Sequence, residues 1–313
     1  MSNRPEFSLT QLLYFVTIAE TENISEAATQ LHASQSAVSS AMQRLERQLG
    51  VQLLLRQRTK GVVLTPSGRL LLDDARKILR QARELKDYSS RLQGTTAGHL
   101  DVGSCWTITP FLIPRTLAAL ALSRPGLKVS VHDTHTPNDL LRDGVCELVV
   151  TYGFATTEET RFTEVVTPPL YAVVGERHPL ATATYATLDE FADQPLLMFN
   201  LSGTNVHYNY VQGVFRKSKA PMPPVIQVTG LESMRSLVSA GVGFMLTHHP
   251  HPTETLGGGR VALVEIVGDR PHLAIGVKTL AETRLSRRAL AFVESLRAVA
   301  EQVYAPIPAS PVR

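Results

Sequence analysis

One stretch of the chain, residues 12–56, decides the fold of the N-terminal part: LLYFVTIAETENISEAATQLHASQSAVSSAMQRLERQLGVQLLLR. Its apolar residues follow helical spacing from Leu12 onward. Just before it, Ser8 and Gln11 have the Ser-x-x-Gln form of a capping box, in which each side chain binds the other residue's backbone N–H. These features predict a first helix over residues 9–21.

Two further helices are predicted within the same stretch. Ser25 can cap a short helix that runs to Leu31. After a tight connection at residues 32–34, a third helix is predicted to end near Gly50, a residue type that favours helix ends. Two helices joined by three or four residues indicate a helix-turn-helix, whose second helix enters the major groove of DNA.

The start of the third helix would then read the bases. Its side chains are small or amide groups that allow close backbone approach, and an amide can both donate to and accept from an adenine edge. The residues predicted to contact DNA from this helix are Ser34, Gln35, Ser36, Ser39, Ser40 and Arg44.

A basic hairpin is predicted after Gly50. Residues 51–64 hold two apolar runs around a basic tip, which is typical of a wing that touches DNA beside the recognition helix, and Arg56, Arg58 and Lys60 are its predicted contacts. Residues 1–93 hold 13 Lys and Arg against 9 Asp and Glu. This excess indicates a phosphate-binding footprint. A solvated charged face explains the charge alone equally well.

A long helix is predicted from Pro66 to about Gln93, because Thr65 can cap it and proline favours the first helical position. Its apolar residues alternate at spacings of four and three, as in a coiled-coil seam, although Ser89 interrupts the pattern. The predicted seam residues are Leu71, Ala75, Ile78, Ala82, Leu85 and Leu92. Packing on a second subunit is favoured, and the alternative is a helix that lies on its own domain.

These features resemble the DNA-binding module of LysR-type transcriptional regulators. The matching positions are Ala27, Ala28, Leu31, residues 34–39, Leu45, Glu46, Leu49, Gly50, Leu53 and the linker entry at residues 64–68. Three positions depart from the family pattern: Ser36 replaces a proline, Leu54 a phenylalanine and Ser40 an arginine. The resemblance implies a winged helix-turn-helix over residues 1–65, a linker helix over 66–93, and a homodimer that pairs into a dimer of dimers on promoter DNA.

The remaining chain has the pattern of an α/β domain. Residues 94–98 are predicted to form a hinge, after which short β-rich runs alternate with helical stretches over residues 99–313. The resemblance implies a domain like that of periplasmic binding proteins, with a small-molecule effector in a cleft between two subdomains. The first would hold residues 99–167 and 272–303, and the second residues 168–271.

The effector cleft is expected at loops that follow strands, where free backbone N–H groups favour anions. Carrying the family's cleft onto this chain gives Trp106, Thr107, His135, Thr136, Tyr152, Phe199, Asn200 and Ser202. Aromatic faces beside hydroxyl groups favour a small aromatic carboxylate. No Lys or Arg stands out at these loops, so hydroxyl groups and helix N-termini would bind the acid. Ordinary core packing remains the alternative for Trp106 and Phe199.

Other classes of protein fit the sequence less well. The chain has 43% apolar and 19% charged residues, an ordinary balance for a folded protein, and no apolar run long enough to span a membrane. Two cysteines without a Cys-x-x-Cys favour a reducing cytoplasm. No cofactor or metal is expected, and the histidines at 248, 249 and 251 are predicted to lie in a surface turn around Pro250 and Pro252.

Two alternative functions remain open. Some members of the resembled family sense peroxide through a cysteine pair, and Cys105 could act as a lone reactive thiol, although Cys146 lies 41 residues away. A serine hydrolase is the other alternative. The sequence has no Gly-x-Ser-x-Gly elbow, so an enzyme is not expected.

Overall fold

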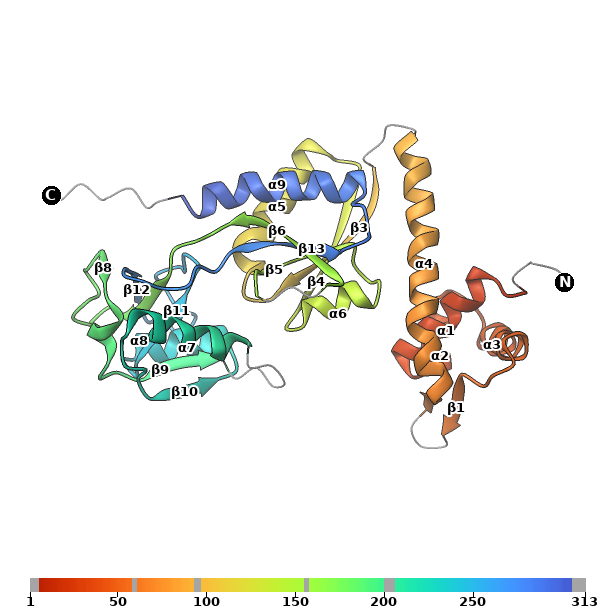
Figure 1. The fold of residues 1–313 in the computed structure, drawn as a ribbon, viewed down its shortest axis with the longest axis horizontal. Helices are drawn as coiled ribbons and strands as arrows, with labels where there is room; N and C mark the ends of the chain where they lie inside the picture. Colours follow the sequence, from red (N-terminus) through yellow and green to blue (C-terminus); the bar gives the residue numbers. More distant parts are fainter. Residues whose placement is uncertain (1–5, 58–60, 93–96, 155–157, 200–205, 306–313) are drawn as a thin grey trace. The chain divides into compact units, whose positions relative to one another are not determined.

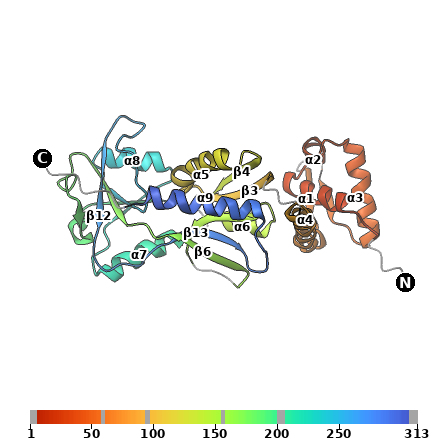
Figure 2. The same cartoon turned by 90° about the horizontal axis from the view of Figure 1, so that it is seen from above.

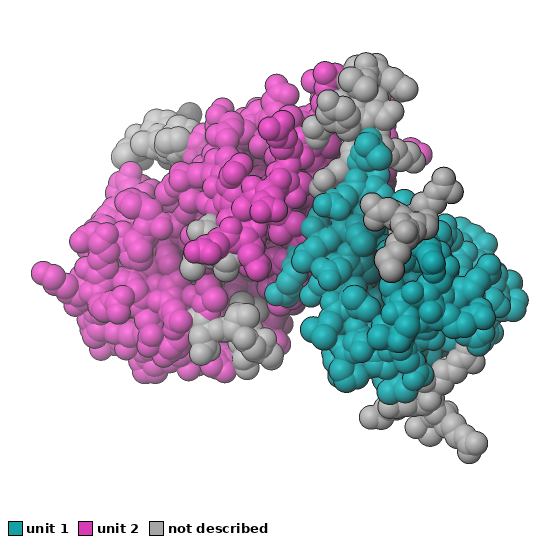
Figure 3. Space-filling view, turned by 45° about the vertical axis from the view of Figure 1, so that its right-hand side comes forward, with its two compact units in different colours: residues 1–96, 142–145 teal, residues 97–141, 146–313 magenta. Residues whose placement is uncertain are grey.

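The computed structural model describes residues 6–57, 61–92, 97–154, 158–199 and 206–305, and for residues 56–57, 83–84 and 86–92 it describes the backbone alone. The chain divides into two compact units, residues 1–96 with 142–145 and residues 97–141 with 146–313 (Figure 3). Within the described ranges, no helix is both long enough and apolar enough to cross a membrane.

The N-terminal unit is a winged helix-turn-helix followed by a long helix (Figure 1). Its elements are α1 (Leu9–Thr21), α2 (Ile24–Gln30), α3 (Gln35–Leu49), the antiparallel strands β1 (Leu54–Gln57) and β2 (Gly61–Leu64), and α4 (Pro66–Leu92). The capping box at the start of α1 is present as predicted. The cap of α2 is Asn23, and not Ser25 as predicted, because the Asn23 side chain accepts the N–H groups of Ser25 and Glu26.

A stripe of apolar side chains on α3 packs into the core of this unit. Val38, Ala41, Met42 and Leu45 are buried, so the opposite side of α3 faces outward. Glu46 ties this helix to the wing, since its carboxylate accepts the backbone N–H groups of Leu53 at 2.8 Å and Leu54 at 3.1 Å.

The entry into α4 is held by Thr65 and Gly68. The Thr65 hydroxyl donates to the carbonyl of Gln52 at 2.7 Å and accepts the N–H of Gly68 at 2.9 Å. A Cβ atom at Gly68 would lie 2.2 Å from the carbonyl oxygen of Leu53. Glycine is therefore required at position 68, because the helix passes directly against the backbone just before β1.

Burial along α4 corrects the predicted seam at its N-terminal end. Ala75 is 4% exposed and packs in the core of the N-terminal unit, with Leu71 packed against the same core. Ala75 is thus covered within one chain and does not face a partner. Ile78 and Leu85 are exposed, Ala82 is half-buried, and the side chain of Leu92 lies outside the described part.

The second unit holds two mixed sheets. The first sheet has the order β4-β3-β5-β13-β6, in which β3 (Gly98–Cys105) pairs in parallel with β4 (Leu127–Thr134) on one side and with β5 (Leu148–Tyr152) on the other. The strands β6 (Thr160–Val166) and β13 (Ile275–Leu280) complete it. Gly98 begins β3 and pairs with Leu127, so the predicted hinge ends before it, and residues 94–96 lie outside the described residues.

The second sheet has the order β10-β9-β11-β7-β12-β8. Its strands are β7 (Tyr171–Gly175), β8 (Tyr185–Ala186), β9 (Leu196–Phe199), β10 (Val225–Val228), β11 (Phe244–Thr247) and β12 (Val261–Ile266). The short 3-10 helix η1 (Leu188–Phe191), α7 (Val206–Ser218) and α8 (Leu231–Ser239) accompany it. Segments 167–170 and 267–274 join the two sheets.

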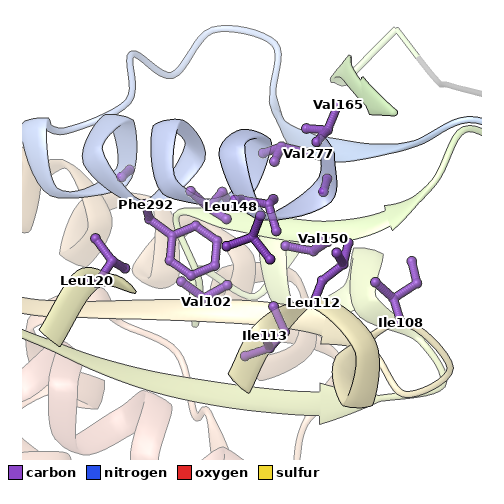
Figure 4. Close-up of a cluster of buried hydrophobic side chains, with 14 of the residues drawn as sticks. Val102, Ile108, Leu112, Ile113, Leu120, Leu148, Val150, Val165, Val277 and Phe292 are labelled. Carbon is purple, nitrogen blue, oxygen red and sulfur yellow. The ribbon is translucent and has the colours of Figure 1, made fainter. Parts of the chain in front are cut away.

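Helices cover both faces of the first sheet. On one face, α5 (Thr109–Ser123) and α9 (Arg287–Val303) lie side by side, as Figure 2 shows, and bury an apolar core around Leu112, Leu148 and Phe292 (Figure 4). On the other face lies α6 (Pro137–Arg142), where a Cβ atom at Gly103 would meet Leu140 at 2.9 Å.

Candidate functional site

The outward side of α3 presents a polar surface suited to a DNA groove. Gln35, Ser36 and Ser40 are exposed, as is Arg44. Ser34 caps the helix, and its hydroxyl accepts the N–H of Ala37 at 3.2 Å. Of the other predicted contacts, Ser39 is half-buried, the side chain of Arg56 is not described, and Arg58 and Lys60 lie outside the described residues.

Two further residues of this surface, Gln43 and Arg47, are not among the predicted DNA contacts, although Arg47 belongs to the basic run that indicates a phosphate-binding footprint. Gln43 and Arg47 are exposed and follow Ser36 and Ser40 at a spacing of seven residues, which places them on the same side of the helix. The helical spacing of the buried stripe is the sequence signal that identifies them.

The second unit contains a cavity of about 440 Å³. Its walls come from segments at the carboxyl ends of β3, β4 and β5 in the first sheet and of β9 and β11 in the second. Ligands of α/β proteins bind at such strand ends, and the volume lies within the usual range of small-molecule sites.

Six of the eight predicted effector residues line this one cavity: Trp106, Thr107, His135, Thr136, Tyr152 and Phe199. Asn200 and Ser202 lie outside the described residues. Trp106 contacts Phe199 edge-on with ring centroids 4.7 Å apart and lies 4.9 Å from the ring of His135. Aromatic side chains from both sheets thus meet at this wall.

The prediction that the three histidines after β11 lie in a surface turn is wrong. His248, His249 and His251 are at most 7% exposed, and all three line the cavity. The Thr247 hydroxyl accepts the N–H of His249 at 3.1 Å and turns the chain inward. The ring of His249 stacks on Phe111 of α5 with centroids 4.4 Å apart.

A chain of hydrogen bonds crosses this part of the cavity. The Tyr152 hydroxyl lies 2.9 Å from the Thr107 hydroxyl and 2.7 Å from Nε2 of His249. The other ring nitrogen of His249, Nδ1, lies 2.7 Å from the hydroxyl of Tyr304. Cys105 extends the chain, with its sulfur 3.3 Å from the Thr107 hydroxyl. These hydrogen bonds connect the segment after β11 with β5 and the end of α9.

Burial keeps the three histidines and Tyr152 uncharged at neutral pH. It lowers the pKa of His248 and of His251 to about 4 and lowers that of His249 well below its usual value. It also raises the pKa of the Tyr152 hydroxyl. Neutral imidazole and phenol groups can each donate one hydrogen bond and accept another, so this wall is polar without being charged.

The one lysine that lines the cavity was not predicted. Lys278 of β13 is 3% exposed, and no other Lys or Arg lies among the described lining residues. It stands more than 70 residues from any of the predicted effector residues in the chain, and only the pairing of β13 with β5 brings it to the site. The sequence contains no local signal that would have identified it.

Both cysteines are free thiols. Burial raises the pKa of Cys105, which lines the cavity, and raises that of Cys146 to about 12. A thiol with a raised pKa is a poor nucleophile because the thiolate is the reactive form. In the described part of the chain, no three His, Cys, Asp or Glu side chains form a group that could hold a metal ion.

Comparison with known proteins identifies the class. Residues 9–69 match the bacterial regulatory helix-turn-helix protein, lysR family, and residues 93–301 match the LysR substrate binding domain. The chain belongs to the LysR family of bacterial transcription regulators, which are DNA-binding proteins with an effector-binding domain and not enzymes.

Individual relatives extend over nearly the whole chain. The DNA-binding transcriptional dual regulator OxyR of Escherichia coli K12 is 29% identical over 294 residues, covering 93% of this chain and 95% of its own. A full-length OxyR variant from Pseudomonas aeruginosa shares the fold, with a TM-score of 0.74, 23% identity, and 98% and 100% coverage. Full-length CbnR, solved with its target DNA, has a TM-score of 0.64, 25% identity, and 94% and 100% coverage.

Proposed function

We propose that this LysR-type regulator senses a small aromatic carboxylate in the cavity of its second unit and changes its promoter binding in response. The observation that supports this effector class is the meeting of Trp106 and Phe199 at the cavity, beside hydroxyl and imidazole groups. Aromatic rings stack well on flat apolar ligands, and a few polar groups orient them. Such a regulator acts where the promoter DNA is, in the cytoplasm.

The position of the cavity provides a mechanism. Its walls belong to both sheets, and the segments 167–170 and 267–274 that join the sheets can act as a hinge. A ligand that contacts both walls favours the closed arrangement, and it acts only through its different affinity for the two arrangements. Closure would then change how the two DNA-binding modules of a dimer reach paired half-sites.

Effector binding can be tested by thermal shift and DNA affinity together. Benzoate and related aromatic acids, aliphatic dicarboxylates, amino acids and sugars are compared on the full-length protein. We expect a rise in melting temperature confined to aromatic acids, because a ligand that binds only the folded state stabilises it. The same acids should change the affinity for promoter DNA. A rise confined to another class would contradict the proposed effector.

Thr107→Val offers a sharper version of this test. If the Thr107 hydroxyl contacts the effector, the variant should lose the response to aromatic acids and still bind promoter DNA. An unaltered response would exclude Thr107 from the site. Loss of DNA binding together with a lowered melting temperature would show that Thr107 serves folding instead.

The two kinds of DNA contact proposed for the first unit are also separable. Gln35→Ala should relax site preference, because Gln35 is exposed at the start of α3, where base edges are read. Arg56→Ala should weaken binding to specific and random DNA alike and lower the slope of affinity against salt. Equal losses on both DNAs for both variants would contradict this division of roles.

Thiol sensing is a second candidate because relatives at 29% identity are named hydrogen peroxide-inducible genes activators and Cys105 lines the cavity. The raised pKa of Cys105 disfavours it. Peroxide treatment of the wild type and of Cys105→Ser distinguishes the two candidates. A peroxide-dependent change in DNA affinity that Cys105→Ser abolishes would establish thiol sensing, and no change in the wild type would exclude it.

A further inference from the structure

The lysine on β13 lies in an unusual environment. Lys278 pairs with Val149 of β5 and with Phe162 of β6, so it stands in the interior of the first sheet. Its neighbour Val277 belongs to the apolar core under α5 and α9. Because side chains alternate along a strand, Lys278 points to the opposite face, the one that α6 covers. It lines the cavity together with Pro137 and Asn138 of that helix.

The ammonium group of Lys278 has no partner there. Among the residues that the structure describes, none gives it a hydrogen bond or an ion pair, and burial lowers its pKa with no compensating charge. The side chain is almost wholly covered, and a cation held away from bulk water without a counter-charge is suited to bind an anion that enters the cavity. Asp139 is the one carboxylate among the described lining residues.

A second unpaired group faces the same cavity. His207, near the start of α7, lies on the wall that the second sheet provides, and its Nδ1 atom is buried with no hydrogen-bond partner among the described residues. Burial lowers the pKa of His207, so the ring is neutral at pH 7. One wall thus offers a cation and the facing wall offers a neutral hydrogen-bonding nitrogen.

We propose that Lys278 is the anion-binding residue of the cavity, pairing with a carboxylate of the effector, while Nδ1 of His207 binds a second, uncharged polar group of the same molecule. The inference rests on the proposed function for the effector's aromatic part. It adds that recognition of the acid depends on a residue of the crossing strand β13 and not only on hydroxyl groups and helix N-termini. A single carboxylate is expected, since the cavity offers one cation.

The chain allows a test that needs no knowledge of the effector. Trp106 is the only tryptophan of the protein and lines the cavity. Quenching of its fluorescence therefore measures the access of small molecules and ions to the cavity. Iodide, caesium and neutral acrylamide are used as quenchers at constant ionic strength, on full-length wild type, Lys278→Met and the charge-preserving Lys278→Arg. We expect iodide quenching to fall at least about twofold in Lys278→Met, with acrylamide quenching unchanged and Lys278→Arg close to wild type. Equal iodide quenching in all three proteins would overturn the proposal.

Aromatic probes then separate this inference from the proposed function. Benzoate and its neutral isostere benzamide are titrated against Trp106 fluorescence. Wild type should prefer benzoate by about 10- to 100-fold, and Lys278→Met should remove that preference, because a hydrogen bond to a charged group contributes about that much. Benzoate binding that is equally tight in Lys278→Met would overturn the role of Lys278 and leave the proposed function intact.

The converse result is equally informative. If neither probe binds wild type while iodide quenching still depends on Lys278, the anion site stands and the aromatic effector class fails.

A His207→Phe variant tests the second group, because it should weaken probes with an added hydroxyl, such as the hydroxybenzoates, more than benzoate itself. Equal weakening of all probes would contradict the role of His207. The wild-type preference for carboxylate over amide requires no variant, so a folding defect in Lys278→Met leaves that test in place.

Discussion

The ring of His249 shows how one residue joins distant parts of the second unit. It is 2% exposed, stacks on Phe111 of α5 and hydrogen-bonds to Tyr152 of β5 and to Tyr304 after α9. Both ring nitrogens are used, which a neutral imidazole can do by donating with one and accepting with the other. A protonated ring would have two donors and would require both tyrosine hydroxyls to accept.

Removal of the Tyr152 hydroxyl should destabilise the second unit. Tyr152→Phe leaves Nε2 of His249 and the Thr107 hydroxyl without this partner, and an unsatisfied buried polar group costs about 1 to 3 kcal/mol. We expect the free energy of unfolding, measured by urea titration of Trp106 fluorescence, to fall by about that amount. Tyr185→Phe, at an exposed hydroxyl, serves as control. Equal effects of the two variants would contradict the role given to Tyr152.

Acid should destabilise the second unit through its buried histidines. Burial lowers the pKa of His248 and His251 to about 4, against about 6.5 in an unfolded chain, so between these values the unfolded state binds more protons. Stability is then greatest above pH 6.5 and falls as the pH drops toward 4, by about 1.4 kcal/mol per pH unit for each ring.

Urea unfolding at several pH values between 7.5 and 4.5 measures this slope. His251→Gln should make the slope shallower, since one titrating ring is removed. His272→Gln, at an exposed ring, should leave it unchanged. A stability that does not vary over this range would show that the histidines are not buried in neutral form.

At the scale of elements, the contact between α4 and Leu53, the residue just before β1, depends on the absence of one side chain. Gly68→Ala would place a Cβ atom 2.2 Å from the carbonyl oxygen of Leu53, so the helix and the segment that leads into β1 must separate. We expect a lowered melting temperature of the N-terminal unit by circular dichroism and weaker DNA binding, because the wing moves with β1. Ser67→Ala, one position earlier in the same helix, should have little effect. Matching melting temperatures for the two variants would contradict this account.

The elements of the first unit could be predicted because their signals are local. The capping box at Ser8 and the glycine at position 50 lie beside the helix ends that they define. The misplaced cap of α2 has an equally local cause. Asn23 and Ser25 are both good capping residues, and only the backbone conformation shows that Asn23 is extended and accepts two N–H groups.

At the scale of the whole molecule, the exposed apolar residues of α4 predict assembly. Leu85 is 72% exposed and Ile78 is exposed seven residues before it, the spacing of a coiled-coil seam. Leu85→Glu should convert a dimer to monomers and reduce affinity for paired half-sites far more than for one half-site. Light scattering after size-exclusion chromatography measures the mass. Leu122→Glu, at another exposed leucine, is the control, and an unchanged mass for Leu85→Glu would exclude this seam.

The sequence by itself determined the order of elements, the helix-turn-helix with its wing and the loops that form the cavity, because these depend on short-range periodicity, caps and strand ends. Only the tertiary structure decided which side chains share the cavity. Lys278 and the buried histidines reach it through the pairing of β13 with β5 and the turn after β11, contacts that join residues more than 90 positions apart. Ala75 was likewise predicted to face a second subunit, but α4 packs it into the core of its own unit. Periodicity shows that a face is apolar, and it does not show what that face packs against.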